Sequence, residues 1–318
     1  MKYTDALQQG KPVFSLELIP PSRGASLDAL YACVEKVASY NPQFITVTQH
    51  QQAIRVEEIN GELVKIPGNK KPGTVAVSTA LKQKFGIETV PHLICAGLDK
   101  FRIEDILIEL RYLGFDNVFA LRGDPRPGER FEPVQDGYRY AVELIAQINA
   151  MNNGTYVTPG EPAERTSFCI GAAGYPEKHV EALNIERDAQ YCADKVKAGA
   201  EYIITQMFFD PNVYFKFVER VRALGVTVPI IPGIKPITDR KTLDLLPRAF
   251  QVSIPDALIR SLDAARTPAE EWEAGTIYMS SLVERLLREG VPGIHVFTYG
   301  VGRSTRSLLS SVFGHAIA

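Results

Sequence analysis

Short apolar runs alternate along the chain with longer segments in which apolar side chains recur at helical spacing. This alternation predicts strand–helix units around a parallel sheet. A helical segment follows each predicted strand, which favours one (β/α)8 barrel of the TIM type over residues 1–318. The strands are predicted at residues 13–18, 44–48, 89–95, 117–122, 167–172, 202–206, 228–231 and 294–299.

The main competitor is a doubly wound open sheet. Such sheets usually carry Gly-x-Gly-x-x-Gly after the first strand, and this chain has Pro-Pro-Ser-Arg-Gly at 20–24 instead. An insertion at about 49–73, rich in Lys, Gly and Pro, follows the second strand. Long insertions between barrel elements are more often functional or lid loops than neutral ones, so we expect this one to border the active site.

Helix ends and breaks have recognisable signals. Ser26 and Thr238 are predicted to cap helices, and Thr-Pro-Ala-Glu at 267–270 predicts a capping box with proline in the first turn. Gly114 is predicted to end the helix before it. Pro-Gly at 232–233 is predicted to break the seventh strand.

Composition narrows the class of protein. Apolar residues make up 45% of the chain, charged residues 23%, and the formal net charge is −2. These values are typical of a globular protein and give no electrostatic indication of nucleic-acid or membrane partners. The first residues lack an apolar signal segment. The four cysteines are isolated, which argues against a metal site and favours reduced thiols in the cytoplasm.

The first predicted strand carries the carboxylate of Glu17 near its end. Strand side chains alternate, so Val13, Ser15 and Glu17 share one face, and Pro20 prevents the strand from continuing. Enzymes with parallel strands keep their chemistry at this end. The same pattern also fits an edge glutamate facing water.

Other strand ends carry donors, rings and acids: Thr48, His92, Arg122, Asp124, Tyr175, Gln206, Thr298 and Tyr299. Together they indicate a wide polar mouth for a large ligand. Each has a structural alternative, since Arg122 and Asp124 could form a salt bridge, and His92 could be a core histidine.

The chain resembles the 5,10-methylenetetrahydrofolate reductase family, in its short bacterial, catalytic-domain-only form. The resemblance covers nearly the whole chain in family order. It rests on Phe-Ser-Leu-Glu-Leu-Ile-Pro-Pro at 14–21, Pro-His-Leu at 91–93, Ala-Leu-Arg-Gly-Asp at 120–124, Tyr-Pro-Glu-Lys-His at 175–179, Lys-Ala-Gly-Ala at 197–200, Thr-Gln-Met-Phe-Phe-Asp at 205–210 and Ile-Pro-Gly-Ile at 231–234.

The resemblance implies a flavoprotein that binds FAD, takes hydride from NAD(P)H and reduces methylenetetrahydrofolate to 5-methyltetrahydrofolate. It implies that Glu17 is the proton donor for folate ring opening, with a pKa expected to be raised by partial burial. It implies further that Asp124 stabilises the cationic intermediate, and that Gln206 and Arg303 contact substrate. A homo-oligomer is compatible with the sequence.

The resemblance also implies a set of FAD-binding residues, in which Arg122, His179 and Lys195 have the character needed near a pyrophosphate. The full set is Thr48, His92, Arg122, Gly123, Asp124, Ala141, Tyr175, His179, Ala182, Asp188 and Lys195.

Two other readings stay open. Tyr191 and Asp194 stand where the family has Asn and Arg, so a flavin-free reductase using NAD(P)H directly is one of them. The other is a non-catalytic folate-binding subunit of a redox complex.

Overall fold

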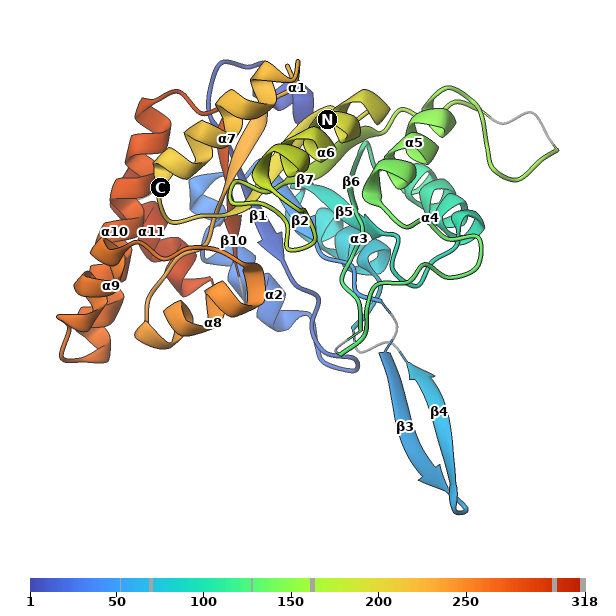
Figure 1. Cartoon of the computed structure of the whole chain (residues 1–318), viewed down its shortest axis with the longest axis horizontal. Coiled ribbons are helices and arrows are strands. Elements are labelled where there is room, and N and C mark those ends of the chain that lie inside the picture. The colour runs from blue at the N-terminus through green and yellow to red at the C-terminus, as the bar shows by residue number, and fades with distance from the viewer. Residues whose placement is uncertain (52, 69–70, 127, 161–163, 299–301, 315–318) are drawn as a thin grey trace.

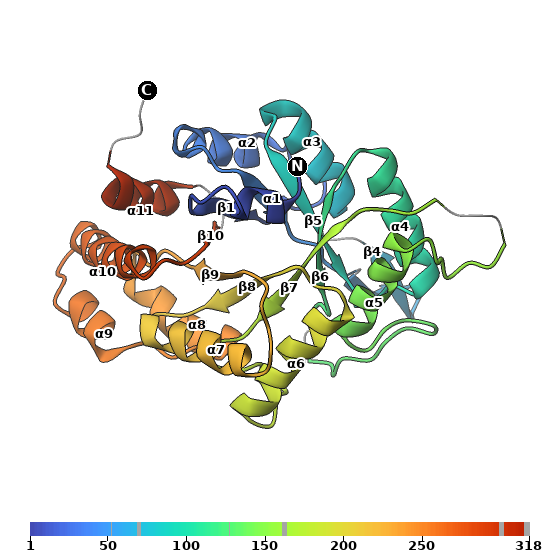
Figure 2. The ribbon, with the colours of Figure 1, turned by 90° about the horizontal axis from the view of Figure 1, so that it is seen from above.

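The predicted barrel is confirmed. The computed structural model describes residues 1–51, 53–68, 71–126, 128–160, 164–298 and 302–314. Eight parallel strands close in the order β1-β10-β9-β8-β7-β6-β5-β2, surrounded by helices (Figures 1 and 2). The barrel strands are β1 (Val13–Leu18), β2 (Phe44–Val47), β5 (Glu88–Ile94), β6 (Asn117–Leu121), β7 (Cys169–Gly174), β8 (Tyr202–Met207), β9 (Ile230–Ile234) and β10 (Gly293–Phe297).

Helices connect the strands and cover the outside of the barrel, except for the first helix, which precedes β1. They are α1 (Tyr3–Leu7), α2 (Asp28–Glu35), the 3-10 turn η1 (Ala38–Tyr40), α3 (Thr74–Phe85), α4 (Lys100–Tyr112), α5 (Ala141–Asn152), α6 (Ile185–Ala198), α7 (Pro211–Ala223), α8 (Arg240–Phe250), α9 (Asp256–Asp263), α10 (Pro268–Arg288) and α11 (Arg303–Phe313). The apolar residues of α4 to α11 pack on the strands in one large core, and those of α2 and α3 pack in a separate cluster.

Helix α1, which the hydrophobic pattern did not predict, closes the end of the barrel opposite the carboxyl ends of the strands (Figure 1). Its Tyr3 is fully buried and stacks between Phe44 and Tyr202, with each ring centroid 4.3 Å away. Aromatic rings stacked in this way stabilise a core beyond their buried area. At this end, among the described residues, the barrel interior is therefore filled by side chains from α1 and seven strands.

The seventh strand does not break at Pro232, which corrects the prediction. β9 runs through Pro232 and Gly233 to Ile234. Its register with β8 shifts between Ile204 and Met207, and the Gly233 amide donates to the Thr205 hydroxyl at 3.0 Å. An irregular ladder with a side-chain acceptor tolerates proline inside a strand.

Two predicted caps each lie one residue before the true N-cap. Leu27 already has helical backbone angles, so α2 starts at Asp28 and Ser26 only accepts from the Asp28 amide at 3.0 Å. Asp239 replaces Thr238 as the cap of α8, because its carboxylate accepts from the Thr242 amide at 2.8 Å. The cap at Thr267 is confirmed.

The segment after β2 forms an antiparallel hairpin of β3 (Ala53–Ile59) and β4 (Glu62–Gly68). The hairpin projects away from the barrel instead of covering it (Figure 1). The expectation of a lid over the mouth is therefore wrong for the hairpin itself.

Two further observations concern the cysteines and the length of the helices. The four cysteines are free and buried, as expected for small core residues. Among the described residues, none of the helices is long and apolar enough to cross a membrane.

Candidate active site

Glu17 lies at the mouth of the barrel between two imidazoles. Its Oε2 is 3.8 Å from Nε2 of His92 on β5 and 3.8 Å from Nε2 of His295 on β10. The Glu17 side chain is 12% exposed, whereas both histidines are buried. Strand alternation therefore places the carboxylate inside the mouth, as predicted, and not at an outer edge.

The pKa of Glu17 is lowered, which contradicts the expectation of a raised value. Burial acts to raise the pKa, but the contact with His295 and the electrostatic influence of the His92, His295 and His50 imidazoles outweigh burial. The ligand-free protein therefore holds Glu17 as a carboxylate near neutral pH. We refer below to Glu17, His92 and His295 as the Glu17 cluster.

His92 is neutral under ordinary conditions, because burial lowers its pKa to about 4. Its Nε2 has no hydrogen-bond partner within the described structure. His92 lies beside Glu17, and its expected contact with FAD stays a prediction.

His92 should make the folded protein sensitive to acid. Its folded pKa lies below the unfolded value of about 6.5, so the unfolded chain binds the proton first as pH falls. Stability should therefore drop between pH 6.5 and about 4, with this histidine contributing up to about 3 kcal/mol. Urea unfolding of parent and His92→Gln across that range measures the slope. Parallel curves for the two proteins would refute the assignment.

His295 was missed at the sequence level, although it is a histidine inside an apolar strand, as His92 is. It pairs with Ser15 in the β1–β10 register, and its Nδ1 lies 2.8 Å from the Ser15 hydroxyl. The Ser15 hydroxyl is in turn 2.8 Å from the hydroxyl of Tyr3. The Ser15 hydroxyl therefore contacts one nitrogen of the His295 ring, while the other nitrogen, Nε2, faces Glu17.

The start of the insertion lies at this mouth. Thr48 Oγ1 is 3.0 Å from His50 Nε2, and Gln51 donates to the Asp124 carbonyl at 2.6 Å. Glu17 and Asp124 both act to raise the pKa of His50, although burial, the largest influence, lowers it. The residues before the hairpin therefore connect the ends of β2 and β6 beside Glu17.

A second group gathers at the ends of β6 and β7. Arg122 forms a salt bridge with Glu181 and lies over the Phe131 ring, with its guanidinium 4.7 Å from the centroid. Lys195 donates to the Ala173 carbonyl at 2.8 Å. Glu181, in the loop before α6, carried no sequence signal that distinguished it from other surface acids. We call Arg122, Tyr175, His179, Glu181, Asp188 and Lys195 the β6–β7 cluster.

The charges in this cluster are largely balanced by its own acids. Burial lowers the pKa of Lys195, and the nearby Asp188 carboxylate partly opposes that shift. Burial also lowers the pKa of His179, and the positive Arg122 adds to the effect. His179 is therefore a neutral ring, which packs edge-on against Tyr175 at 4.8 Å.

Three small residues belong to the predicted FAD-binding set. Gly123 has a positive φ of 80°, and a Cβ there would lie 2.9 Å from the Cβ of Ala96. Ala141 is the first residue of α5, and Ala182 is buried with its carbonyl accepting from Lys178 at 3.0 Å.

The two predicted substrate contacts differ in position. The Gln206 side chain is near Tyr175 and Phe250 at the end of β8, and its Oε1 accepts from the Met207 amide at 2.9 Å. Arg303 is exposed on α11, with its guanidinium 5.0 Å from the Trp272 ring centroid. No interaction between Arg303 and the Glu17 cluster is found within the described structure. Tyr299 lies outside the described residues.

These features define a (β/α)8-barrel protein with a polar site at the carboxyl ends of its strands, where enzymes of this fold carry their chemistry. The family model for methylenetetrahydrofolate reductase matches residues 2–312. The chain belongs to that family.

Curated relatives agree with the family. The chain is 29% identical to the probable methylenetetrahydrofolate reductase (NADH) of Oryza sativa subsp. japonica, covering 98% of this chain and 50% of the relative. It is 32% identical to methylenetetrahydrofolate reductase 2 of Saccharomyces cerevisiae, covering 97% and 49%. It thus spans about half the length of these relatives. The 5,10-methylenetetrahydrofolate reductase of Pectobacterium carotovorum is 27% identical, with 91% and 86% covered.

A solved structure shares the fold. It is described as an uncharacterized protein from Clostridium thermocellum that binds two copies of 5-methyl-5,6,7,8-tetrahydrofolic acid. The likeness has a TM-score of 0.59 at 13% identity and covers 98% of both chains. At this identity it supports the barrel architecture alone.

Proposed function

We propose that the chain reduces 5,10-methylenetetrahydrofolate to 5-methyltetrahydrofolate with NAD(P)H in the cytoplasm, supplying methyl groups for methionine synthesis. The observation that carries this proposal is the Glu17 carboxylate, held at the mouth of the barrel by two buried histidines in a chain of this family.

Glu17 would be the proton donor to N10 of the folate. The five-membered ring must open before its methylene carbon accepts hydride, and ring opening needs a proton on N10. Glu17 is ionised without ligand, so it would have to take up a proton as substrate covers it. A bound ring that excludes the remaining water would raise the carboxyl pKa in that direction.

Asp124 would act through charge. It is exposed at the mouth, and its carboxylate influences His50 on one side and Tyr175 and His179 on the other. A fixed negative charge there would favour the cationic iminium that forms after ring opening. Gln206, at the end of the neighbouring β8, would contact the substrate ring.

The β6–β7 cluster fits the phosphates of FAD. Arg122 and Lys195 lie at the ends of β6 and β7. Because Gly123 has no side chain, the backbone there could approach the phosphates closely. FAD would supply a two-electron carrier between NAD(P)H and folate. Tyr175 and His179 would flank it, Asp188 would orient Lys195, and Glu181 would have to leave Arg122.

Turnover by the purified chain tests the activity. We expect NADH or NADPH oxidation that depends on methylenetetrahydrofolate and yields 5-methyltetrahydrofolate in equal amount. NAD(P)H oxidation without that product, or no oxidation with either nucleotide, would contradict the proposal.

Flavin binding has its own pair of variants. Lys195→Ala should loosen FAD about tenfold or more, because it removes a charged phosphate donor. Glu181→Gln should tighten FAD, because it frees Arg122 from its carboxylate partner. Flavin absorbance and fluorescence titration of the apoprotein measure both. Unchanged affinity in both variants would place the flavin elsewhere.

A second candidate function is direct hydride transfer from NAD(P)H to folate without flavin. It is favoured by the salt bridge of Glu181 to Arg122, and by Asp194, which accepts from Gln190 on the same helix. A colourless protein that still forms 5-methyltetrahydrofolate would establish it.

A further inference from the structure

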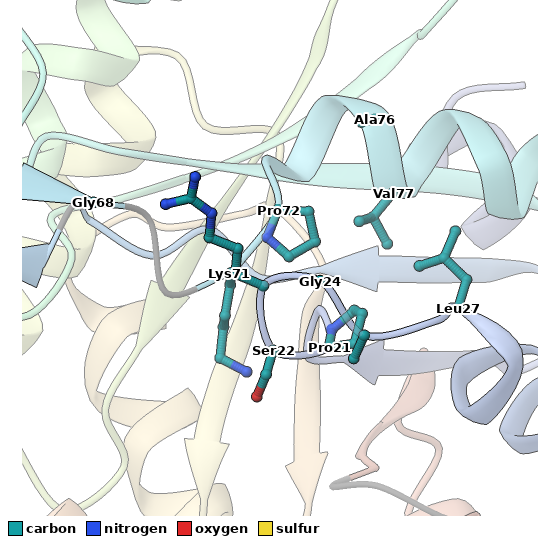
Figure 3. A pocket seen from close by; sticks show the side chains of 11 residues that line it. Pro21, Ser22, Gly24, Leu27, Gly68, Lys71, Pro72, Ala76 and Val77 are labelled. Atoms are coloured by element: carbon teal, nitrogen blue, oxygen red, sulfur yellow. The ribbon is translucent and has the colours of Figure 1, made fainter.

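A cavity of about 600 Å³ lies beside the proposed active site and is not explained by it. Its walls are the loop after β1, the end of β4 and the first turn of α3 (Figure 3). The lining residues include none of the Glu17 cluster or of the β6–β7 cluster. Those that matter here are Ser22, Arg23, Leu27, Lys71 and Val77.

The cavity has an apolar end and a cationic end. Leu27 and Val77 lie together at one end, within the apolar cluster under α2 and α3 (Figure 3). Lys71 and Ser22 point the same way at the other end (Figure 3). The Lys71 amine donates to the Pro20 carbonyl at 2.7 Å and keeps further N–H groups for a ligand.

The positive charge of the cavity is not neutralised by the protein around it. The lining includes Arg23 and Lys71 and contains no aspartate or glutamate. Within the part of the chain that the structure describes, neither cation pairs with a carboxylate. Burial lowers the pKa of Lys71, so a nearby anion would relieve a real cost.

The cationic end adjoins the mouth of the barrel. His50 lies within electrostatic range of both Lys71 in the cavity and Glu17 in the mouth. Lys71 acts to lower the pKa of His50, and Glu17 acts to raise it. Lys71 also donates to the carbonyl of Pro20, which is three residues after Glu17 in the sequence. A molecule whose reactive ring lies at Glu17 could therefore extend an arm into the cavity.

We propose that this cavity is an anion-binding subsite for the carboxylate- or phosphate-bearing arm of a substrate that reacts at Glu17. The proposal rests on the function proposed above, whose two substrates both carry such an arm. Folate has glutamyl carboxylates beyond an aromatic ring, and NAD(P)H has phosphates beyond its nicotinamide. Arg23 and Lys71 would bind the anion, while Leu27 and Val77 would contact the apolar part.

Binding of isolated anions tests the subsite without turnover. Calorimetry with inorganic pyrophosphate and with tri-γ-glutamate should detect binding of at least one probe by the parent protein. Arg23→Gln and Lys71→Gln should each weaken that binding about tenfold or more, the cost of losing a charged hydrogen bond. The matched control is Lys216→Gln, an exposed lysine on α7 with the same charge change, which should bind as the parent does.

Kinetics then identify the arm. A rise in KM confined to folate triglutamate, relative to the monoglutamate, assigns the glutamyl arm, and a rise confined to NAD(P)H assigns the nucleotide. Absence of binding of both probes by the parent, or equal binding by parent and cavity variants with unchanged unfolding midpoints, overturns the subsite. Lack of turnover with intact probe binding would instead reject the proposed function and leave the anion site standing.

Discussion

Replacing Glu17 by glutamine should slow the folate half-reaction by ~10²–10⁴-fold, the usual cost of losing a positioned general acid. Glutamine has nearly the same shape, so the contacts of the mouth with His92 and His295 should persist. In the flavin-dependent reaction proposed above, reduction of the flavin by NAD(P)H needs no such acid and should stay within about tenfold of the parent rate. Anaerobic stopped flow on each half-reaction measures the two effects separately.

The pH profile of the parent distinguishes an acid from a fixed charge. If Glu17 donates a proton, the folate half-reaction should fall as pH rises above the pKa of the complex. A purely electrostatic role would give the opposite trend, with the rate falling as the carboxylate becomes protonated. Oxidation of reduced flavin by methylenetetrahydrofolate at the parental rate in Glu17→Gln would show that another group is the acid. Collapse of both half-reactions would indicate a structural role.

Tyr3→Ala should destabilise the fold by about 3–5 kcal/mol, as for other large aromatic side chains removed from a core. Tyr3 is fully buried and stacks on Phe44 and Tyr202 inside the barrel. The surrounding strands are tied into a closed sheet and cannot collapse into the space. The free energy of unfolding in urea measures the loss.

Tyr3→Phe is the matched control. It keeps the stacked ring and removes only the hydroxyl that contacts Ser15 at 2.8 Å. We expect a loss of about 1 kcal/mol, the net worth of one hydrogen bond. Equal losses in Tyr3→Ala and Tyr3→Phe would mean that the hydroxyl, and not ring packing, holds α1 in the barrel.

The barrel was predictable because its signal is local. Each strand is a short apolar run and each helix has its own periodicity, so neighbouring residues alone define the elements. The place of Glu17 followed from alternation along one strand. α1 escaped prediction because five residues give too little periodicity to identify a helix. The predicted break of the strand at Pro232 was wrong, because a strand tolerates proline here through the Thr205 side chain of the neighbouring strand.

The electrostatics of the site were not predictable, because they arise between distant strands. Burial of Glu17 could be inferred from its own strand, and burial alone raises a carboxyl pKa. The lowering comes from histidines on β5 and β10, whose side chains meet Glu17 only in the folded barrel. The salt bridge between Arg122 and Glu181 could not be predicted for the same reason, since the two residues lie in different loops.

The closure of β1 against β10 also bears on how the protein is made. Ser15 and His295 are 280 positions apart in sequence, yet their contact orients the imidazole beside Glu17. On the ribosome β1 can pair with β2 early, but its other edge stays open until β10 emerges. Contacts this distant close slowly, and an open strand edge can pair with other chains meanwhile. Assembly of the Glu17 cluster is thus among the last events of folding, so a stalled or truncated chain retains an exposed edge and lacks the chemistry.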